Sequence, residues 1–363
     1  MKFSTKKDEL IRAVGIASHL STTRATLPIL QNILLKTKTN KLIIRSTDLE
    51  QTLEIVVKGE VAEEGQITTP SRLLLEYIQN NTDSDITLET EDTTLLVHSL
   101  NHQAQIKGLP AEEYPVIPEI KPTQTATLKV ETIKEAISQT LFATAHDDSR
   151  PILNGLLWRF DEKGLTVVGT DGYRLAYYTS LESQTNLKGD YILPKKTMQE
   201  VLKIAESGEL RIDLSGNQVR FTTEGISLIS RILEGVFPDY QAIIPKKTAQ
   251  EVLLDSQALT QSLRLASLFS RDSAFSTKLN LATNKLTISA ISPHLGESVN
   301  EVQLAETVTE PLIISLNAQY LLDALTQLTG PVRLRLTNNR SPIILESPKS
   351  SNFLYLLMPL RSE

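Results

Sequence analysis

The sequence predicts an α+β fold built from three tandem copies of one domain, and recurring motifs are the main reason. The tripeptide Pro-Ile-Leu at 28–30 recurs at 151–153, and the dipeptide Thr-Asp at 47–48 recurs at 170–171. Both offsets are 123 residues, from 28 to 151 and from 47 to 170. Self-similarity at a fixed spacing is typical of a repeat architecture.

Residues that begin helices recur at nearly the same spacing. Pro70, Pro194 and Asn317 each precede an apolar run, and they lie 124 and 123 residues apart. Proline suits a first helical turn and asparagine suits an N-cap. We therefore divide the 363 residues into three domains that each bury a core. Their expected bounds are 1–120, 121–247 and 248–363.

Each third begins with a predicted helix, because apolar residues recur at intervals of three and four. The stripes are Leu10, Val14 and Ala17, then Ile133, Ile137 and Leu141, then Leu259, Leu263 and Ala266. Two apolar runs follow each helix and flank a short polar segment, which predicts a β-hairpin. The paired runs are 33–35 with 42–44, 156–158 with 165–167, and 279–281 with 286–288.

A second helix and further strands complete each third. The second helices carry the stripes Leu74, Tyr77 and Ile78; Met198, Val201, Leu202 and Ala205; and Leu321, Leu325 and Leu328. The runs at 86–88, 210–212 and 332–334 predict closing strands. Each domain thus consists of two similar helix-plus-strand half-units, with antiparallel strands outside and helices on one face. A row of such half-units has a free sheet edge at each end, and head-to-tail association closes it into a ring if the rotation closes.

Composition narrows the function classes. The chain has no cysteine, and its net charge of −6 argues against a dedicated tight nucleic-acid binder, which is usually basic. The first residues have no apolar signal core, and no apolar run is long enough to span a membrane. We expect a cytoplasmic protein without membrane association.

Cations lie opposite several apolar stripes on helical wheels. They are Arg12, Arg72, Lys203 and Arg264, and Arg24, Arg150, Lys195, Lys196 and Arg271 lie in loops or at helix ends nearby. One interpretation is a solvated helix face, and Glu135 opposite the stripe of its helix favours it. The other is a recurring cationic face for a polyanion, favoured by its recurrence in several helices.

Motifs for catalysis are missing from the sequence. The run His146-Asp147-Asp148 has no further histidine or cysteine at metal-ligand spacing, and the segment 169–172 lacks the pattern of a phosphate-binding loop. We expect no metal, no cofactor and no enzyme activity. Two alternatives stay open, a repeat-built enzyme with an unrecognised carboxylate pair and a general protein-binding scaffold.

Five stretches carry a resemblance to a known family over the whole chain. They are Arg-Ala-Thr-Leu-Pro-Ile-Leu at 24–30, Ser-Arg-Pro-Ile-Leu-Asn-Gly at 149–155, Thr-Asp-Gly-Tyr-Arg-Leu-Ala at 170–176, Gly-Val-Phe-Pro-Asp-Tyr at 235–240 and Tyr-Leu-Leu-Met-Pro-Leu-Arg at 355–361. With these stretches the chain resembles the β sliding clamps of bacterial DNA polymerase III. The resemblance implies a processivity factor without a catalytic motif, and a head-to-tail homodimer ring around duplex DNA of any sequence.

The resemblance also implies partners and sites. The partners are the polymerase α subunit, the clamp loader, the 3′–5′ exonuclease-containing polymerase complex, and other polymerases and repair proteins, all bound through short linear motifs. Their cleft between the second and third domains is implied to consist of Leu153, Thr170, Gly172, Tyr173, Arg174, Leu175, Pro238, Ile243, Leu356, Met358 and Leu360, with Asn317, Tyr320 and Pro342 beside it. The residues implied for DNA are Arg24, Arg72, Arg150, Lys195 and Lys196. Those implied for the dimer interface are Ile106, Leu268 and Phe269.

Ordinary core packing is the alternative for several of these residues, namely Leu153, Leu175, Leu356 and Leu360 in the cleft, and Leu268 with Phe269 at the interface. The chain also departs from the family pattern at Tyr173, where relatives often have histidine, and at Ala242, where some have a basic residue. These departures bear on which peptides bind.

Overall fold

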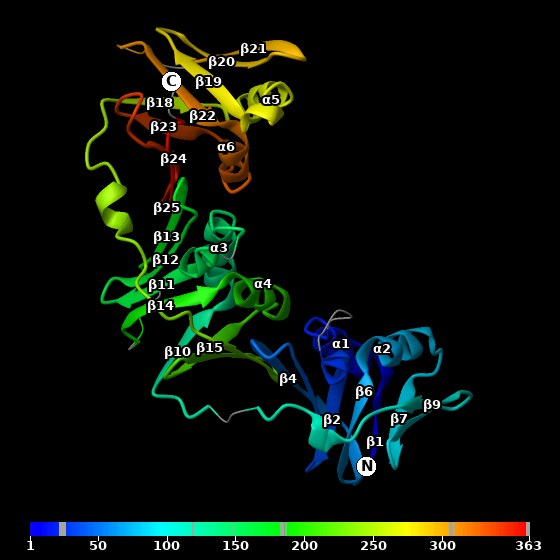
Figure 1. Ribbon diagram of the computed structural model, residues 1–363. Coiled ribbons are helices and arrows are strands. Elements are labelled where there is room, and N and C mark those ends of the chain that lie inside the picture. Colours follow the sequence, from blue (N-terminus) through cyan, green and yellow to red (C-terminus); the bar gives the residue numbers. More distant parts are fainter. Residues whose placement is uncertain are drawn as a thin grey trace. The chain divides into compact units, whose positions relative to one another are not determined.

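A computed structural model describes residues 1–21, 27–117, 120–147, 149–181, 185, 187–304, 308 and 310–360 (Figure 1). Contacts within the chain divide it into two compact units. The first unit is Met1–Glu131 with Gln199–Ile232, and the second is Thr132–Met198 with Leu233–Glu363. Within the described residues every strand pairing is antiparallel, as the sequence predicts.

Six α-helices occur in the described part of the chain, one for each predicted stripe. They are α1 (Lys7–Ala17), α2 (Ser71–Asn80), α3 (Val130–Leu141), α4 (Lys195–Ile204), α5 (Ser256–Ser267) and α6 (Ala318–Leu325). The predicted stripes are buried, except that Tyr77 and Leu202 are half-buried. Ala205 and Leu328 are buried too, but they lie beyond the ends of α4 and α6. No helix in these described ranges is long and apolar enough to span a membrane.

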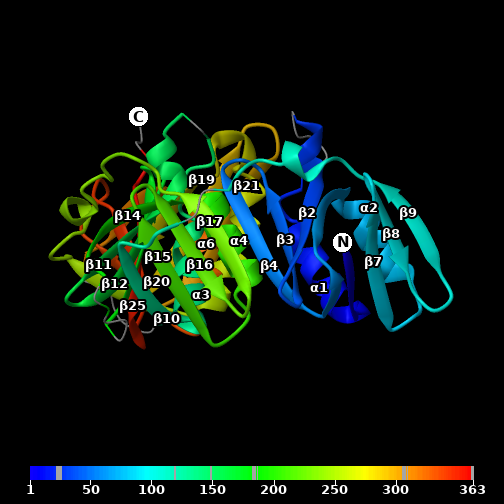
Figure 2. The ribbon, with the colours of Figure 1, turned by 90° about the horizontal axis from the view of Figure 1, so that it is seen from below.

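The first unit contains two sheets. A five-stranded sheet has the order β5 (Glu60–Glu63), β1 (Lys2–Lys6), β7 (Asp85–Glu91), β8 (Thr94–His98) and β9 (Gln103–Lys107). An eight-stranded sheet has the order β10 (Gln124–Lys129), β15 (Glu209–Ser215), β16 (Gln218–Thr223), β17 (Ile226–Arg231), β4 (Gln51–Lys58), β3 (Lys41–Thr47), β2 (Asn32–Lys38) and β6 (Gly65–Pro70). Figure 2 shows β4, β3 and β2 side by side. The first two repeats join where Ile226 of β17 pairs with Ile55 of β4.

The second unit repeats this plan. Its eight-stranded sheet has the order β14 (Gly189–Pro194), β11 (Gly155–Asp161), β12 (Gly164–Thr170), β13 (Arg174–Ser180), β25 (Ser350–Leu357), β24 (Ile343–Ser347), β23 (Val332–Leu336) and β18 (Gln250–Leu254). Its four-stranded sheet has the order β21 (Gly296–Gln303), β20 (Lys285–Ser292), β19 (Ser276–Leu281) and β22 (Leu312–Asn317). Here the repeats join where Leu175 of β13 pairs with Leu356 of β25.

The second helices of the first two repeats begin one residue later than their prolines predict. Pro70 is the last residue of β6, pairs with Asn32 of β2, and acts as the N-cap of α2 rather than as its first helical residue. Pro194 likewise ends β14, and α4 begins at the next residue. The prediction for Asn317 is confirmed, because its side chain accepts a hydrogen bond from the Tyr320 amide at 3.0 Å.

The recurring Thr-Asp pair forms the same turn in both repeats. In the first, the Asp48 carboxylate accepts the Gln51 amide at 2.7 Å, and the Thr47 hydroxyl donates to the Gln51 carbonyl. In the second, Asp171 and Thr170 make the same two bonds with Arg174, at 3.0 and 2.6 Å. The motif thus recurs because each copy needs the same side chain to backbone turn between two strands.

Candidate functional site

A small cavity of about 190 Å³ opens in the second unit where the second and third repeats join. Its lining comes from Leu153, Thr170, Gly172, Tyr173, Arg174, Leu175, Pro238, Asp239, Tyr240, Ile243, Leu356 and Met358. Pairing of β13 with β25 brings these distant segments together, and the Met358 amide donates to the Tyr173 carbonyl at 2.9 Å. We call this cavity the cleft.

The Thr-Asp turn sets the side chains at the mouth of the cleft. Gly172 has φ +91°, a left-handed conformation that glycine adopts without strain, and it directs the chain into β13. Tyr173 next to it is 59% exposed, and Met358 across the pairing is 38% exposed. An exposed aromatic ring and a flexible thioether therefore flank the opening, where they are able to adapt to a ligand.

The floor of the cleft is a buried apolar cluster. Its members are Leu157, Val168, Leu175, Ile192, Tyr240, Ile344 and Leu356. Leu175 and Leu356, for which core packing was the alternative, are each 1% exposed, so they serve as core and as floor at once. Burial raises the pKa of Tyr240, so its hydroxyl stays neutral over the physiological range.

Buried contacts of the Arg174 side chain hold one wall of the cleft in place. Its guanidinium is bonded to Asp171 at 3.0 Å, to Asp323 of α6 at 2.6 Å and to the Phe142 carbonyl at 2.8 Å, and it lies 4.2 Å from the ring centroid of Tyr320. Burial by itself lowers the pKa of Arg174, but the hydrogen bond with Asp323 and the surrounding negative charges leave it above the ordinary value. The buried cation therefore stays charged and holds β13 against α6.

The structure brings together most of the residues that the resemblance implies for the cleft. Leu360 does not line it; the Leu360 amide donates to the Ser315 carbonyl at 2.8 Å, so the chain follows β22 instead. Asn317 caps α6, Tyr320 lies beside the site beneath Arg174, and Pro342 is half-buried just before β24.

Asp239 and Tyr240 line the cleft but are missing from the prediction. Both belong to the stretch at 235–240, which is one of the five that carry the family resemblance. Nothing in the sequence, however, indicates which of its side chains face the cavity.

The cations predicted for DNA have different surroundings. Arg72 of α2, Arg150 and Lys196 are exposed, whereas Arg24 lies outside the described residues. Lys195 is half-buried, 3.4 Å from Nδ1 of His146, and burial and the charge of Arg174 lower its pKa.

Two helix cations that the wheels place on an open face are bound to carboxylates. Arg12 pairs with Glu206 at 3.2 Å and with Glu224 at 3.6 Å, and Lys203 pairs with Glu200 at 2.9 Å. Neighbouring acidic residues therefore neutralise part of the predicted cationic face of the helices.

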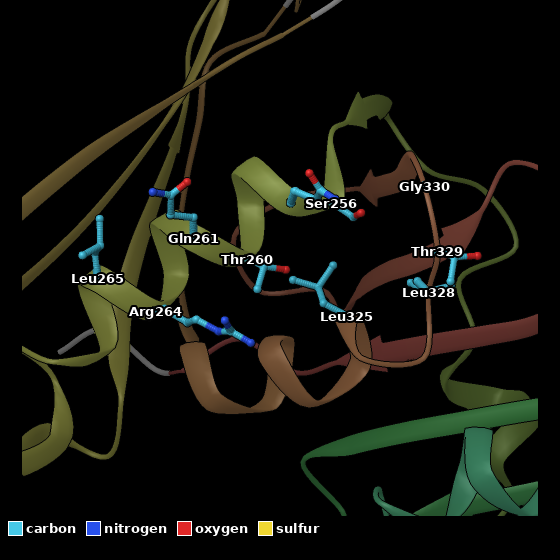
Figure 3. Close-up of a pocket in the computed structure, with 10 residues that line it drawn as sticks. Ser256, Thr260, Gln261, Arg264, Leu265, Leu325, Leu328, Thr329 and Gly330 are labelled. Atoms are coloured by element: carbon cyan, nitrogen blue, oxygen red, sulfur yellow. The ribbon is translucent and has the colours of Figure 1, made fainter.

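A polar groove runs between α5 and α6 (Figure 3). One part, about 760 Å³, is lined by Ser256, Gln257, Thr260, Gln261, Arg264, Leu265, Leu325, Leu328, Thr329 and Gly330. Figure 3 shows Arg264 extending from α5 toward α6. A neighbouring part of about 450 Å³ contains both Arg264 and Arg271. The groove therefore places two arginines beside an open polar surface of the third repeat.

The residues implied for a dimer interface lie near two sheet edges. Ile106 is on β9, an edge strand of the five-stranded sheet, with its side chain buried. Leu268, which follows α5, is 47% exposed, and Phe269 packs partly buried against the core of the third repeat. This packing of Phe269 favours the core alternative over an interface role for this residue. Strand β21 is an edge of the four-stranded sheet.

The described ranges hold no side-chain cluster that could bind a metal ion. No group of three or more of the side chains that bind metals lies together there.

Comparisons with known proteins give one family for the whole chain. Models of the DNA polymerase III beta subunit match in order, the N-terminal domain at 1–118, the central domain at 127–239 and the C-terminal domain at 241–361. The beta sliding clamp of Caulobacter vibrioides is 30% identical over 375 residues, covering 99% of this chain and 100% of that protein. The beta sliding clamp of Staphylococcus aureus is 28% identical and covers both chains fully.

Solved structures agree. The DNA polymerase III beta subunit of Pseudomonas aeruginosa has a TM-score of 0.96 at 29% identity, and the sliding clamp of Bacillus subtilis has 0.94 at 26% identity. Each comparison covers 100% of both chains. The chain belongs to the family of bacterial DNA polymerase III beta subunits, the beta sliding clamps.

Proposed function

We propose that this protein is a DNA sliding clamp, a processivity factor that encircles duplex DNA and holds a DNA polymerase on its template. The match of three family domains in order along nearly the whole chain carries this proposal. The clamp acts in the cytoplasm as an accessory subunit without a catalytic site of its own. Tethering accelerates synthesis by raising the effective concentration of polymerase at the primer end.

The charge distribution suits a protein that slides. Tight binding to many phosphates slows movement and makes affinity depend steeply on salt. In a chain of net charge −6, the pairing of Arg12 and Lys203 with carboxylates weakens the attraction of the helices for phosphates. The exposed Arg72, Arg150, Lys196 and Arg264 contact the backbone weakly and without reading sequence. Retention then depends on topology rather than on affinity.

Two copies form the ring by joining unlike sheet edges. In this proposal β9 of one copy pairs with β21 of the next, which continues a sheet across the seam and removes two free edges. Their charges are complementary, because exposed Lys107 lies on β9 while exposed Glu297 and Glu301 lie on β21. Exposed Leu268 directly follows α5, which packs against β21, and it adds apolar contact.

The cleft binds short linear segments of the partners. Its apolar floor and adaptable Met358 suit apolar anchor side chains, while the backbone of the Thr-Asp turn fixes their orientation. The α subunit, the clamp loader, other polymerases and repair proteins then compete for one site. A clamp from Pseudomonas aeruginosa, 29% identical, is described bound to griselimycin, so a relative with this fold takes a ligand of its own.

A primer-extension assay with the matching polymerase tests this proposal. We expect the protein to lengthen the products of single binding events, and the double variant Met358→Ala with Ile243→Ala to lose this effect. The same variant weakens binding of a labelled polymerase peptide by about tenfold or more, since it removes two anchor contacts. Leu265→Ala, a residue of similar exposure on α5, serves as the control. Equal peptide affinity in the double variant and the control would place the site elsewhere.

A further inference from the structure

A second and larger groove adjoins the cleft. It measures about 490 Å³ and is lined by Leu157, Arg159, Asp190, Ile192, Gly235, Val236, Phe237, Pro238, Asp239, Tyr240 and Gln241. Its volume lies in the ordinary range for ligand sites, about 300–1,000 Å³, whereas the cleft at about 190 Å³ is below that range. The cleft alone therefore accommodates only a small part of a bound peptide.

The two cavities are adjacent and share part of their lining. Pro238, Asp239 and Tyr240 line both of them, and we call this shared segment the ridge. One buried cluster lies beneath both, because Leu175 and Leu356 belong to the cleft while Leu157 and Ile192 belong to the second groove.

Tyr240 and Arg159 make the ridge rigid. Arg159 donates to the Asp190 carboxylate from Nε at 2.8 Å and from Nη2 at 2.6 Å, and from Nη1 to the Tyr240 hydroxyl at 3.2 Å. Its guanidinium carbon lies 5.5 Å from the ring centroid of Tyr240. These bonds commit three of the five N–H groups of a guanidinium, which leaves donors for a carbonyl or carboxylate of a ligand.

The outer wall of the second groove is also fixed in place. A side chain at Gly235, where φ is +144°, would come within 2.5 Å of Ile152, so the backbone packs closely there. Beside this anchored point Val236 is 92% exposed, and Phe237 is only half-buried. A preformed surface of this kind binds without a cost for ordering the loop.

We propose that the second groove binds the residues of a partner peptide that flank the segment in the cleft. It takes one apolar side chain against Leu157, Ile192 and Phe237, with a neighbouring carbonyl or carboxylate on Arg159. This inference rests on the proposed peptide-binding function of the cleft and extends that site across the ridge. Partners with a suitable flank then outcompete partners that carry the short motif alone.

Fluorescence anisotropy on the full-length protein tests the inference. The probes are a labelled peptide with the cleft-binding motif of the polymerase α subunit, and versions extended on either side by their natural flanking residues with one leucine placed in the flank. Burial of that leucine predicts about tenfold tighter binding for one of the two extended peptides. Val236→Glu abolishes this gain and leaves the short peptide unaffected. Val116→Glu, a change at an equally exposed valine of the first unit, leaves both affinities unchanged.

The outcomes separate the inference from the function on which it rests. If the short peptide binds and neither extension adds affinity, the second groove is not a subsite although the cleft is. If the short peptide does not bind at all, the proposed cleft and this inference both fail. Photocrosslinking from the flank to the segment 235–241 in the unmutated protein supports the inference, and crosslinks only to other segments overturn it.

Discussion

Arg174 shows how one side chain joins the cleft to the rest of the third repeat. Its backbone lies in the Thr-Asp turn at the mouth of the cleft, and its guanidinium reaches Asp323 on α6. The side chain is 2% exposed, so its interactions are made in a medium that screens charge poorly. The family resemblance predicts Arg174 as part of the cleft. Only the structure shows that its guanidinium binds the carboxylates of Asp171 and Asp323.

Replacing Arg174 by glutamine should destabilise the second unit strongly. The change leaves the carboxylate of Asp171 buried without its cation, and breaking a buried pair in this way costs about 3–5 kcal/mol. We expect the thermal midpoint of this unit to fall by on the order of 10 °C in calorimetry. Arg333→Gln, at a pair where the arginine is 38% exposed, should cost less than about 1 kcal/mol. Equal shifts for the two variants would contradict this role of Arg174.

Asp213 makes the first unit sensitive to acid. Burial by itself raises the pKa of Asp213, but hydrogen bonds from Arg220, Thr125 and Arg211 outweigh burial and lower the pKa. Its carboxylate therefore stabilises the folded state above the unfolded pKa of about 3.9. That contribution disappears as the pH falls through this value toward the folded pKa.

Thermal midpoints measured between about pH 6 and pH 3 test the contribution of Asp213. Asp213→Asn should lower the midpoint at pH 6, and its decline toward pH 3 should be shallower than that of the unmodified protein. Parallel declines in the two proteins would show that this carboxylate has the same pKa folded and unfolded.

At the level of elements, the N-cap residues of the two helices in the third repeat make different sets of hydrogen bonds. Asp255 caps α5 by accepting the Ala258 amide at 2.8 Å. Asn317 caps α6 and also donates to the Ala274 carbonyl at 2.9 Å, which ties the start of the helix to the loop before β19. Since α6 carries both Tyr320 and Asp323, this cap supports the contacts of Arg174.

Asn317→Ala should therefore cost about 0.5–2 kcal/mol and loosen α6 in particular. Hydrogen exchange monitored by mass spectrometry should show faster exchange in the peptide that covers α6, while α5 stays protected. Asn317→Asp keeps the acceptor and should retain most of the protection. Uniform loss of protection across the third repeat, or no change in α6, would contradict a local capping role.

Local elements could be predicted from the sequence because their patterns are local. The stripe of Leu259, Leu263 and Ala266 needs only helical spacing, and the hairpin of β2 and β3 needs only two apolar runs around Thr39 and Asn40. Both turn residues have positive φ, as a tight hairpin requires. Helix α2 begins one residue later than predicted, because Pro70 still pairs with Asn32 as the last residue of β6.

Joins between repeats could not be predicted in this way. Ile55 pairs with Ile226 and Leu175 pairs with Leu356, and no periodicity in the sequence encodes such distant partners. The cleft is built on the second of these joins, so its residues became visible only through resemblance. The sequence does not predict Tyr240 as part of the cleft, because its orientation depends on contacts with Arg159 of β11 and Tyr177 of β13.

For the molecule as a whole, the proposal depends on two copies meeting at unlike edges. The change Leu268→Ala should weaken this seam and shift the protein toward monomers in sedimentation velocity. Leu268 is exposed in a single copy, so it is available to a second one, and its loss removes apolar area from the interface. Leu265→Ala has matched exposure and should leave the dimer intact. A dimer that withstands the loss of the Leu268 side chain would rule out this seam.

Release from DNA ends is the most direct test of encirclement. The protein is loaded on a nicked circular duplex with its clamp loader, freed of excess protein by gel filtration, and then treated with an enzyme that cuts the circle once. A clamp held by topology with few phosphate contacts slides off the new ends, so bound protein should fall sharply after cutting and persist on uncut circles. Equal retention on cut and uncut DNA would contradict encirclement.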